Sequence, residues 1–225
     1  MRVSKSISSF VCIGAVGLVS LGAYADEEGE HYDIGAWNDN GVLRTGGWDH
    51  DEEVLAVNNL RVFEAHFGED PEFPFAIDEP GIGGVAADLG LPVNSTLSLN
   101  MNAGLGVWNG NGFDASGSSM LVDYGPSSMS SINGGQLDFL ITDDYDLHPI
   151  YSIDPASASG SYLLEFTVSM NGFIASDSFW IVFNLGMDDE DYEESVEWVE
   201  SNLVPAPGGL AMLAVSLIAT RRRRR

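Results

Sequence analysis

Two histidines with acidic neighbours are the side chains of this sequence best suited to chemistry. His50 lies in the tripeptide Asp49-His50-Asp51, and His148 follows a second acidic segment. Imidazole nitrogens and carboxylate oxygens are ligands of zinc and of other transition ions. If the fold brings the two segments together they can form a metal site, and if it does not, both histidines are polar loop residues. The candidate metal ligands are Asp49, His50, Asp51, Asp144, Asp146 and His148.

Calcium is the alternative cation, because it takes oxygen ligands from acidic loops. Asn38-Asp39-Asn40-Gly41 resembles the middle of an EF-hand loop, but Ala36 and Gly47 fall at the two ends, where that loop needs carboxylates. A calcium site in this chain would therefore be irregular. Its candidate oxygen donors are Asp49, Asp51 and Glu52, or Asp143, Asp144 and Asp146.

Catalytic signatures are absent from the sequence, which predicts that the protein is not an enzyme. It contains no G-x-S-x-G elbow, no H-E-x-x-H helix and no phosphate-binding glycine loop with a lysine. Aromatic side chains leave sugar binding open as an alternative. Trp48 and Trp108 adjoin glycine turns and are expected to be exposed, whereas Trp180 is expected in the core.

The charge of the chain excludes one class of partner. All 34 acidic residues lie between Asp26 and Glu200, where the only basic side chains are Arg44 and Arg61, so this span carries 2 − 34 = −32. Such a surface repels the phosphate backbone of nucleic acids. It is compatible with a well-solvated extracellular protein or with one that binds cations.

Short alternating segments separated by glycine turns predict an all-β domain over residues 26–185. Asn40-Gly41 predicts a hairpin between 31 and 48, and Leu97, Leu99 and Met101 share one face of a strand. The segment 162–170 also alternates, and 179–183 is apolar on both faces, as in a central strand. Residues 69–84 contain three prolines and three glycines and are expected to form a surface loop. We therefore expect an antiparallel β-sandwich, jelly-roll-like, with a barrel as the alternative.

The segments beyond this domain differ in character. Residues 186–203 are strongly acidic and predict either a short helix or a disordered spacer. Residues 1–25 have the three parts of a secretory signal peptide: Arg2 and Lys5, an apolar middle, and Ala23 and Ala25 as the A-x-A site for signal peptidase. The single cysteine, Cys12, lies in this leader, so the mature protein would have no disulfide.

The C-terminal tail, residues 204–225, combines a proline motif, an apolar segment at 208–220 and an arginine cluster. Residues 205–220 span about 24 Å as a helix, shorter than the roughly 30 Å hydrocarbon core, and the arginines favour the cytoplasmic side. The motif is Val204, Pro205, Ala206, Pro207 and Gly208, and the cluster is Arg221, Arg222, Arg223, Arg224 and Arg225.

This tail resembles the PEP-CTERM sorting signal of exported Gram-negative proteins, with Ala206 where that family usually has glutamate. The resemblance implies an exosortase-like processing enzyme as partner, transient anchoring in the inner membrane, and delivery to the cell surface or the extracellular space. The upstream domain is similar to uncharacterised secreted sandwich domains that carry such tails. The resembling stretches are Gly46 to Asp51, Arg61 to Phe63 with Phe67-Gly68, Asp78 to Gly81, Val107 to Gly110, and Ser178 to Asn184. The sequence thus predicts an exported structural or binding protein of the surface or matrix. The alternative is a calcium-dependent carbohydrate-binding or polysaccharide-active protein with a surface glycan as partner.

Overall fold

The computed structural model describes residues 32–102 and 104–205. Over these residues the chain forms sixteen strands, arranged in four sheets, and one helix. The predicted all-β class is therefore confirmed. The predicted signal peptide and residues 206–225 of the tail lie outside the described residues. No helix in the described part of the chain is long and apolar enough to cross a membrane.

The largest sheet has seven strands and is built around two long neighbours, β15 and β16. Five of the seven strands pair in one series, and the other two lie beside it, because β8 pairs with β15 and β9 pairs with β8. In order, the strands are β12 (Gly135–Leu140), β7 (Thr96–Met101), β15 (Gly160–Met170), β16 (Phe179–Leu185) and β4 (Val62–His66), with β8 (Gly106–Trp108) and β9 (Phe113–Ala115) at the side.

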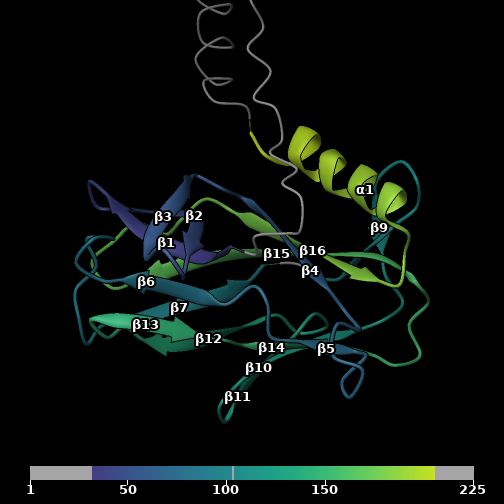
Figure 1. The fold of residues 1–225 in the computed structure, drawn as a ribbon, viewed down its shortest axis with the longest axis horizontal. Helices are drawn as coiled ribbons and strands as arrows, with labels where there is room; N and C mark the ends of the chain where they lie inside the picture. Colours follow the sequence, from purple (N-terminus) through teal and green to yellow (C-terminus); the bar gives the residue numbers. More distant parts are fainter. Residues whose placement is uncertain (1–31, 103, 206–225) are drawn as a thin grey trace, which may run out of the picture. The chain divides into compact units, whose positions relative to one another are not determined.

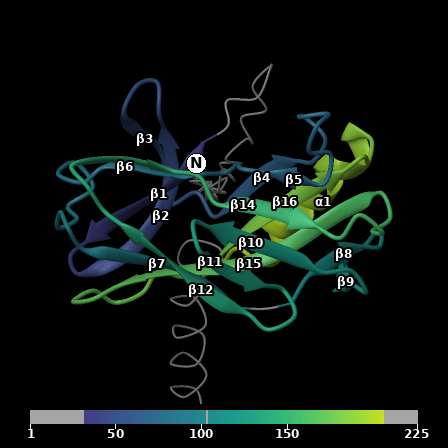
Figure 2. The same cartoon turned by 90° about the horizontal axis from the view of Figure 1, so that it is seen from below.

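Three smaller sheets complete the fold. The four-stranded sheet lies on the opposite side of the core from the helix, as the views in Figures 1 and 2 show. It runs β11 (Ser127–Ser130), β10 (Met120–Tyr124), β14 (Ile150–Ile153) and β5 (Ala76–Ile77). The others are β1 (Asp33–Asp39), β2 (Val42–Asp49) and β3 (Val54–Asn58), and the pair β13 (Asp144–Leu147) and β6 (Ile82–Val85).

The predicted N-terminal hairpin is present as β1 and β2. Asn40 and Gly41 make its two-residue turn with φ of 53° and 90°, a left-handed backbone that asparagine and glycine adopt most readily. The turn sets the register of the whole hairpin and places Asp33 opposite Trp48 at its far end. Local turn chemistry therefore decides where the first acidic side chain of the domain lies.

Strand β16 is buried along its entire length, as its sequence predicted. Phe179, Ile181 and Phe183 pack into the main core. Trp180 and Val182 point to the other face and join a second apolar cluster. The strand lies between β15 and β4, so both of its edges are paired. The two clusters cover its two faces.

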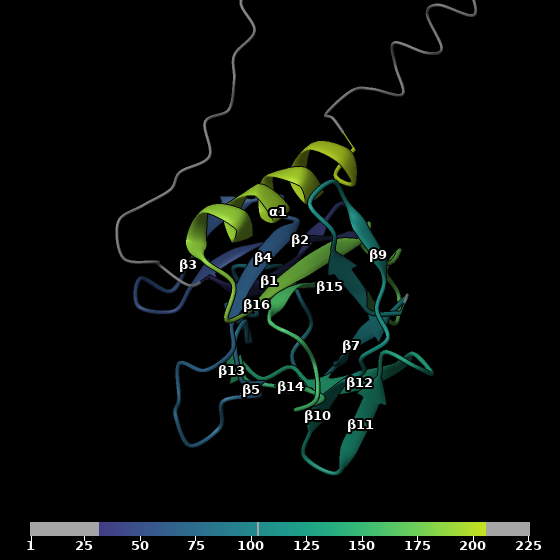
Figure 3. The same cartoon turned by 90° about the vertical axis from the view of Figure 1, so that its right-hand side faces the viewer.

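Helix α1 (Asp189–Asn202) provides the cover for that second face. The side chain of Asp188 caps it by accepting the N–H of Asp191 at 3.2 Å. Tyr192 and Val199 are 2% and 0% exposed and pack onto the sheet, where Figure 3 shows the helix lying along β4, β16 and β15. Of the two structures predicted for residues 186–203, the structure shows the helix, and its buried side chains pack on the sheet.

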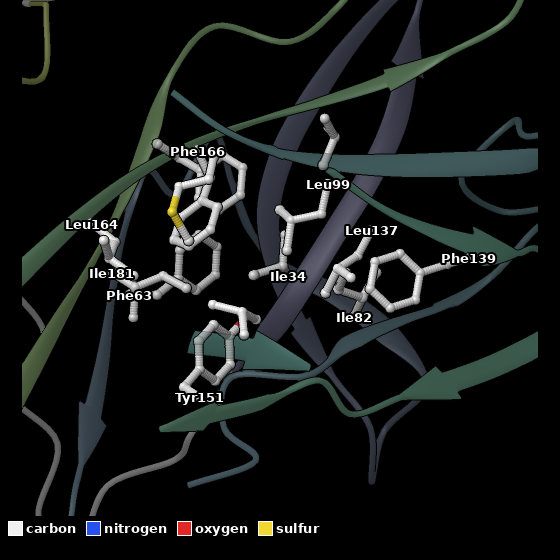
Figure 4. Packing of buried hydrophobic residues seen from close by; sticks show 14 of the residues in the cluster. Ile34, Phe63, Ile82, Leu99, Leu137, Phe139, Tyr151, Leu164, Phe166 and Ile181 are labelled. Carbon is white, nitrogen blue, oxygen red and sulfur yellow. The ribbon is translucent and has the colours of Figure 1, made fainter. Parts of the chain in front are cut away.

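The main core lies between the large sheet and the strands that face it. Tyr151 of β14 contacts Phe183 of β16 with ring centroids 5.3 Å apart, which joins the two sheets. Figure 4 shows side chains from β1, β4, β6, β7, β12, β14, β15 and β16 meeting in this space. The predicted inward faces are confirmed, because Leu97 and Leu99 are fully buried.

Three predictions about the fold are wrong in part. The pairing of β16 with β4 is parallel, so the sheets are not wholly antiparallel. Residues 69–84 are not all surface loop, because they include β5 and the first three residues of β6, and Ile82 is fully buried. Trp48 is 2% exposed and belongs to the core instead of the surface. Each error concerns long-range packing, which decides burial independently of local propensity.

The docking of α1 predicts a measurable contribution to stability. Replacing Tyr192 by alanine removes a buried ring and should lower the free energy of unfolding by about 3–5 kcal/mol. The conservative Tyr192→Phe removes the hydroxyl, which donates to the carbonyl of Val182 at 2.9 Å, and should lower it by about 1 kcal/mol. Chemical denaturation of the full chain measures both, and unchanged stability in Tyr192→Ala would mean that the helix is not part of the cooperative unit.

Candidate functional site

Acidic and histidine side chains from four segments meet where β1, β6 and β13 begin or end. Asp33 starts β1, and Glu79 lies in the connection from β5 to β6. Asp146 lies on β13 and His148 follows that strand directly. His50 lies in the turn after β2. We call these five residues the acid–histidine cluster.

Asp33 is the buried member of the cluster, with 6% of its surface exposed. Its Oδ1 accepts the N–H of Gly81 at 2.8 Å, and Oε2 of Glu79 accepts the same N–H at 3.1 Å. One backbone group therefore holds both carboxylates in place. One ligand atom each of Asp33, Glu79 and His148 lie within 4.8 Å of one another. Asp33 makes no ion pair with any described residue.

Glycines on β6 and just before it make room for this arrangement. A Cβ on Gly81 would lie 2.7 Å from Oδ1 of Asp33 and 2.9 Å from the His148 ring. A Cβ on Gly83 would lie 2.9 Å from Oδ2 of Asp33 and 2.6 Å from Trp48. The backbone of β6 is also paired with β13, with Gly83 opposite Asp146. Any larger residue at either position would push the carboxylate of Asp33 away from the imidazole.

Both ring nitrogens of His148 face hydrogen-bond acceptors. Nδ1 lies 3.0 Å from the carbonyl oxygen of Asp78, and Nε2 lies 2.7 Å from Oδ1 of Asp146. A carbonyl oxygen only accepts, so Nδ1 carries a proton and donates it. Nδ1 also lies 3.5 Å from Oε1 of Glu79. In the absence of a metal ion the ring is therefore held as an imidazolium between two carboxylates.

The electrostatics of the cluster shift three pKa values in one direction. Burial raises the pKa of Asp33, and the negative charge of Asp146 raises it further. Burial also raises the pKa of Glu79, and the negative charge of Asp33 adds to that rise. Burial alone would lower the pKa of His148, but its hydrogen bond to Asp78 and the carboxylates of Glu79, Asp146 and Asp33 outweigh burial and raise it. Each group thus favours its protonated form more than it would in water.

The structure brings together the two segments that the sequence singled out. Nε2 of His50 lies 3.8 Å from Oδ2 of Asp146, whose other oxygen faces His148. One carboxylate thus lies between the two predicted histidines. The other three predicted residues have no side-chain contact with these groups: Asp49 caps its own turn by accepting the N–H of Glu52 at 3.0 Å, and Asp51 and Asp144 are exposed.

Sequence reasoning missed Asp33 and Glu79, the two half-buried or buried carboxylates. Asp33 is one acid among many, and only the hairpin register places it beside β6. Glu79 lies in the stretch that was interpreted as a surface loop. The one local signal was Pro80-Gly81 followed by Ile82 and two more glycines, a stretch of backbone that leaves room for neighbouring side chains.

The aromatic side chains do not form the predicted exposed pair. Trp48 is buried beside Gly83. Trp108 is half-buried and packs against Phe113 and against Trp198 of α1, with ring centroids 5.3 Å and 6.1 Å away. Trp180 is 6% exposed, which confirms its prediction as a core residue. The Trp108 cluster therefore fastens the helix to β8 and β9.

Comparison with known proteins assigns no family: no protein-family model matches the chain, and no curated protein matches it.

The three raised pKa values predict how stability depends on pH. A buried acid with a raised pKa loses stability as pH rises from its unfolded value, 3.8 for Asp33 and 4.5 for Glu79, toward the folded value. His148 stabilises the fold fully below pH 6.5 and loses that contribution as pH rises through its own raised pKa. All three effects have the same sign, so in metal-free protein the stability that this cluster contributes should fall as pH rises above 3.8, and the loss from His148 should begin above pH 6.5.

Asp33→Asn should flatten this profile, because it removes one buried acid and one of the charges that hold the proton on His148. The control is Asp51→Asn, which removes a nearby exposed charge and should keep the slope of the parent protein. Thermal unfolding of the full chain in chelator-containing buffer measures both. Identical slopes for the parent protein and Asp33→Asn would show that the cluster does not govern the pH dependence.

Proposed function

We propose that the protein is an exported structural or binding module of the cell surface or extracellular matrix, sorted by its PEP-CTERM-like tail. The observation that carries this proposal is the charge balance of the described residues. Four of the 34 acids, Asp26, Glu27, Glu28 and Glu30, precede them, which leaves 34 − 4 = 30 acids against two arginines. A domain with this charge stays soluble and monodisperse where external salt screens its self-repulsion.

The two arginines do not offset this charge at the surface. Arg44 is paired with Asp177 at 3.0 Å and with Asp39 at 3.5 Å. Arg61 donates to the carbonyl oxygen of Ser178 and lies over the ring of Trp180, 5.3 Å from its centroid. Both therefore serve the fold, where they fasten neighbouring strands and the segment before β16. What remains outward is an acidic surface that attracts cations and repels nucleic acid and anionic lipid.

Two features of the fold support a tail-sorted surface module. Its architecture corresponds best to a jelly-roll-like β-sandwich, since the four-stranded and seven-stranded sheets meet through Tyr151 and Phe183 across one core. The described domain ends close to the sorting motif. Leu203 and Val204 pack against the second apolar cluster, between α1 and the sheet, and Pro205 is exposed. A processing enzyme would thus meet the motif directly beside a folded, cysteine-free domain.

Calcium-dependent sugar binding is the second candidate, and the half-exposed aromatic cluster of Trp108, Phe113 and Trp198 favours it. Aromatic faces of this kind bind the apolar faces of sugar rings. A glycan array with and without calcium separates the two functions. Binding that needs calcium and is lost in Trp108→Ala supports the second candidate, whereas silence across the array supports the first.

Sorting by the tail predicts a change of location when the tail is removed. A chain truncated after Pro205 keeps the residues that pack on α1, so the domain should fold and leave the envelope fraction for the soluble extracellular fraction. The full chain is the reference. A second variant with Arg221–Arg225 changed to serine tests orientation and should slow maturation, because the positive residues hold the C-terminus in the cytoplasm.

Fractionation of the host cells with antibody detection measures both outcomes. If the truncated protein remains in the envelope fraction, the tail is not its anchor and the sorting proposal is wrong.

A further inference from the structure

We propose that the acid–histidine cluster binds one divalent transition ion of the zinc type, held by His50, Asp146 and His148. This inference goes beyond surface localisation and does not depend on the sorting tail. It rests on the arrangement of the five side chains, on a buried carboxylate without an ion pair, and on the charge of the surrounding chain.

The orientation of His148 is that of a metal ligand. Histidines that bind metals use one ring nitrogen and donate the N–H of the other to a carbonyl or carboxylate, which fixes the ring. Here Nδ1 donates to the carbonyl oxygen of Asp78 at 3.0 Å. That bond leaves Nε2 as the nitrogen for the ion, and Nε2 faces Asp146 at 2.7 Å. In the metal-bound state the ion would replace the proton now shared along this contact.

Asp146 lies between the two imidazoles. Its Oδ1 faces His148 and its Oδ2 lies 3.8 Å from Nε2 of His50. Ligand atoms on a tetrahedral ion with bonds of about 2.1 Å lie about 3.4 Å apart. The separations of 2.7 Å and 3.8 Å fall on either side of this value, and each joins one ring to a different oxygen of Asp146, so ion binding requires the rings of His50 and His148 to turn toward one another. His50 is exposed and lies in a turn, where such a rotation is easy.

Asp33 and Glu79 provide the second, independent reason to expect a cation. Asp33 is 94% buried (6% exposed), accepts the N–H of Gly81 and has a ligand atom within 4.8 Å of one of His148, yet it makes no ion pair with any described residue. Burying a carboxylate is costly unless a positive charge or a proton compensates it. Three carboxylates surround one imidazolium in this cluster, which leaves an excess of negative charge. A divalent ion that displaces the proton from Nε2 of His148 adds one net positive charge and so reduces this excess.

The two arginines of the described chain do not supply this charge, because Arg44 is paired with Asp177 and Arg61 is held by Ser178 and Trp180. The donor set then decides which ion is preferred. Calcium and magnesium take oxygen ligands in larger number, whereas two imidazoles with a carboxylate suit zinc and its transition-metal neighbours. Three protein ligands leave a coordination position open for water or for a group from a bound partner.

The test is calorimetric titration of the full chain, purified in mild detergent and stripped with chelator, with Zn²⁺ and in parallel with Ca²⁺. We expect one saturable zinc site per chain and a calcium affinity at least tenfold weaker. His50→Gln changes an exposed side chain and should leave the fold intact, yet it should weaken zinc binding at least tenfold. His148→Gln and Asp146→Asn should do the same. Cys12, His31 and His66 are present in every variant, so differences report on the cluster.

The charge-matched control is Asp51→Asn, which removes a carboxylate next to His50 without removing a ligand. It should change the zinc affinity less than threefold. Asp33→Asn keeps all three ligands and should therefore weaken zinc binding less than His50→Gln, His148→Gln or Asp146→Asn does. Zinc binding that is unchanged in both His50→Gln and His148→Gln, or calcium binding equal to zinc binding, would overturn the proposal and assign the affinity to the acidic surface as a whole.

Discussion

The fold depends on the burial of β16 on both of its faces. A strand with the sequence Phe-Trp-Ile-Val-Phe-Asn-Leu has no side that can face water, so it is stable only between two apolar layers. The main core covers Phe179, Ile181 and Phe183, and α1 covers Trp180 and Val182. This requirement explains why an acidic helix folds onto an acidic domain. Its seven charged side chains remain in water while Tyr192, Val196 and Val199 close the second cluster.

A second constraint is electrostatic. The described chain has almost no positive charge, so its carboxylates must be exposed, protonated, hydrogen-bonded or neutralised from outside. Most are exposed, but Asp33 and Glu79 are drawn inward by the register of β1 and by the backbone of β6. There a single N–H and His148 stabilise them only in part. The same packing that completes the core thus creates a site with an excess of negative charge and two imidazoles at its rim.

The elements with a strong local signal could be predicted from the sequence. The strand predicted from the alternation of Leu97, Leu99 and Met101 is β7, and the Asn-Gly turn fixes the first hairpin. Strands such as β5, β6, β13 and β14 were missed, because they are short, lie among prolines and glycines, and form only through long-range pairing. The parallel partner of β16 was missed for a related reason: alternation says which residues face inward and nothing about the direction of the neighbour.

For the site, the sequence by itself determined the chemistry that was available: two histidines with acids beside them, no catalytic motif, a single cysteine, and a strongly negative composition. Composition and local order set these properties, which no packing can change. Tertiary structure alone decided which acids take part. It set Asp146 between His50 and His148, left Asp49, Asp51 and Asp144 aside, and added Asp33 and Glu79, because strand register and glycine-lined backbone determine which of 30 similar carboxylates lose their water.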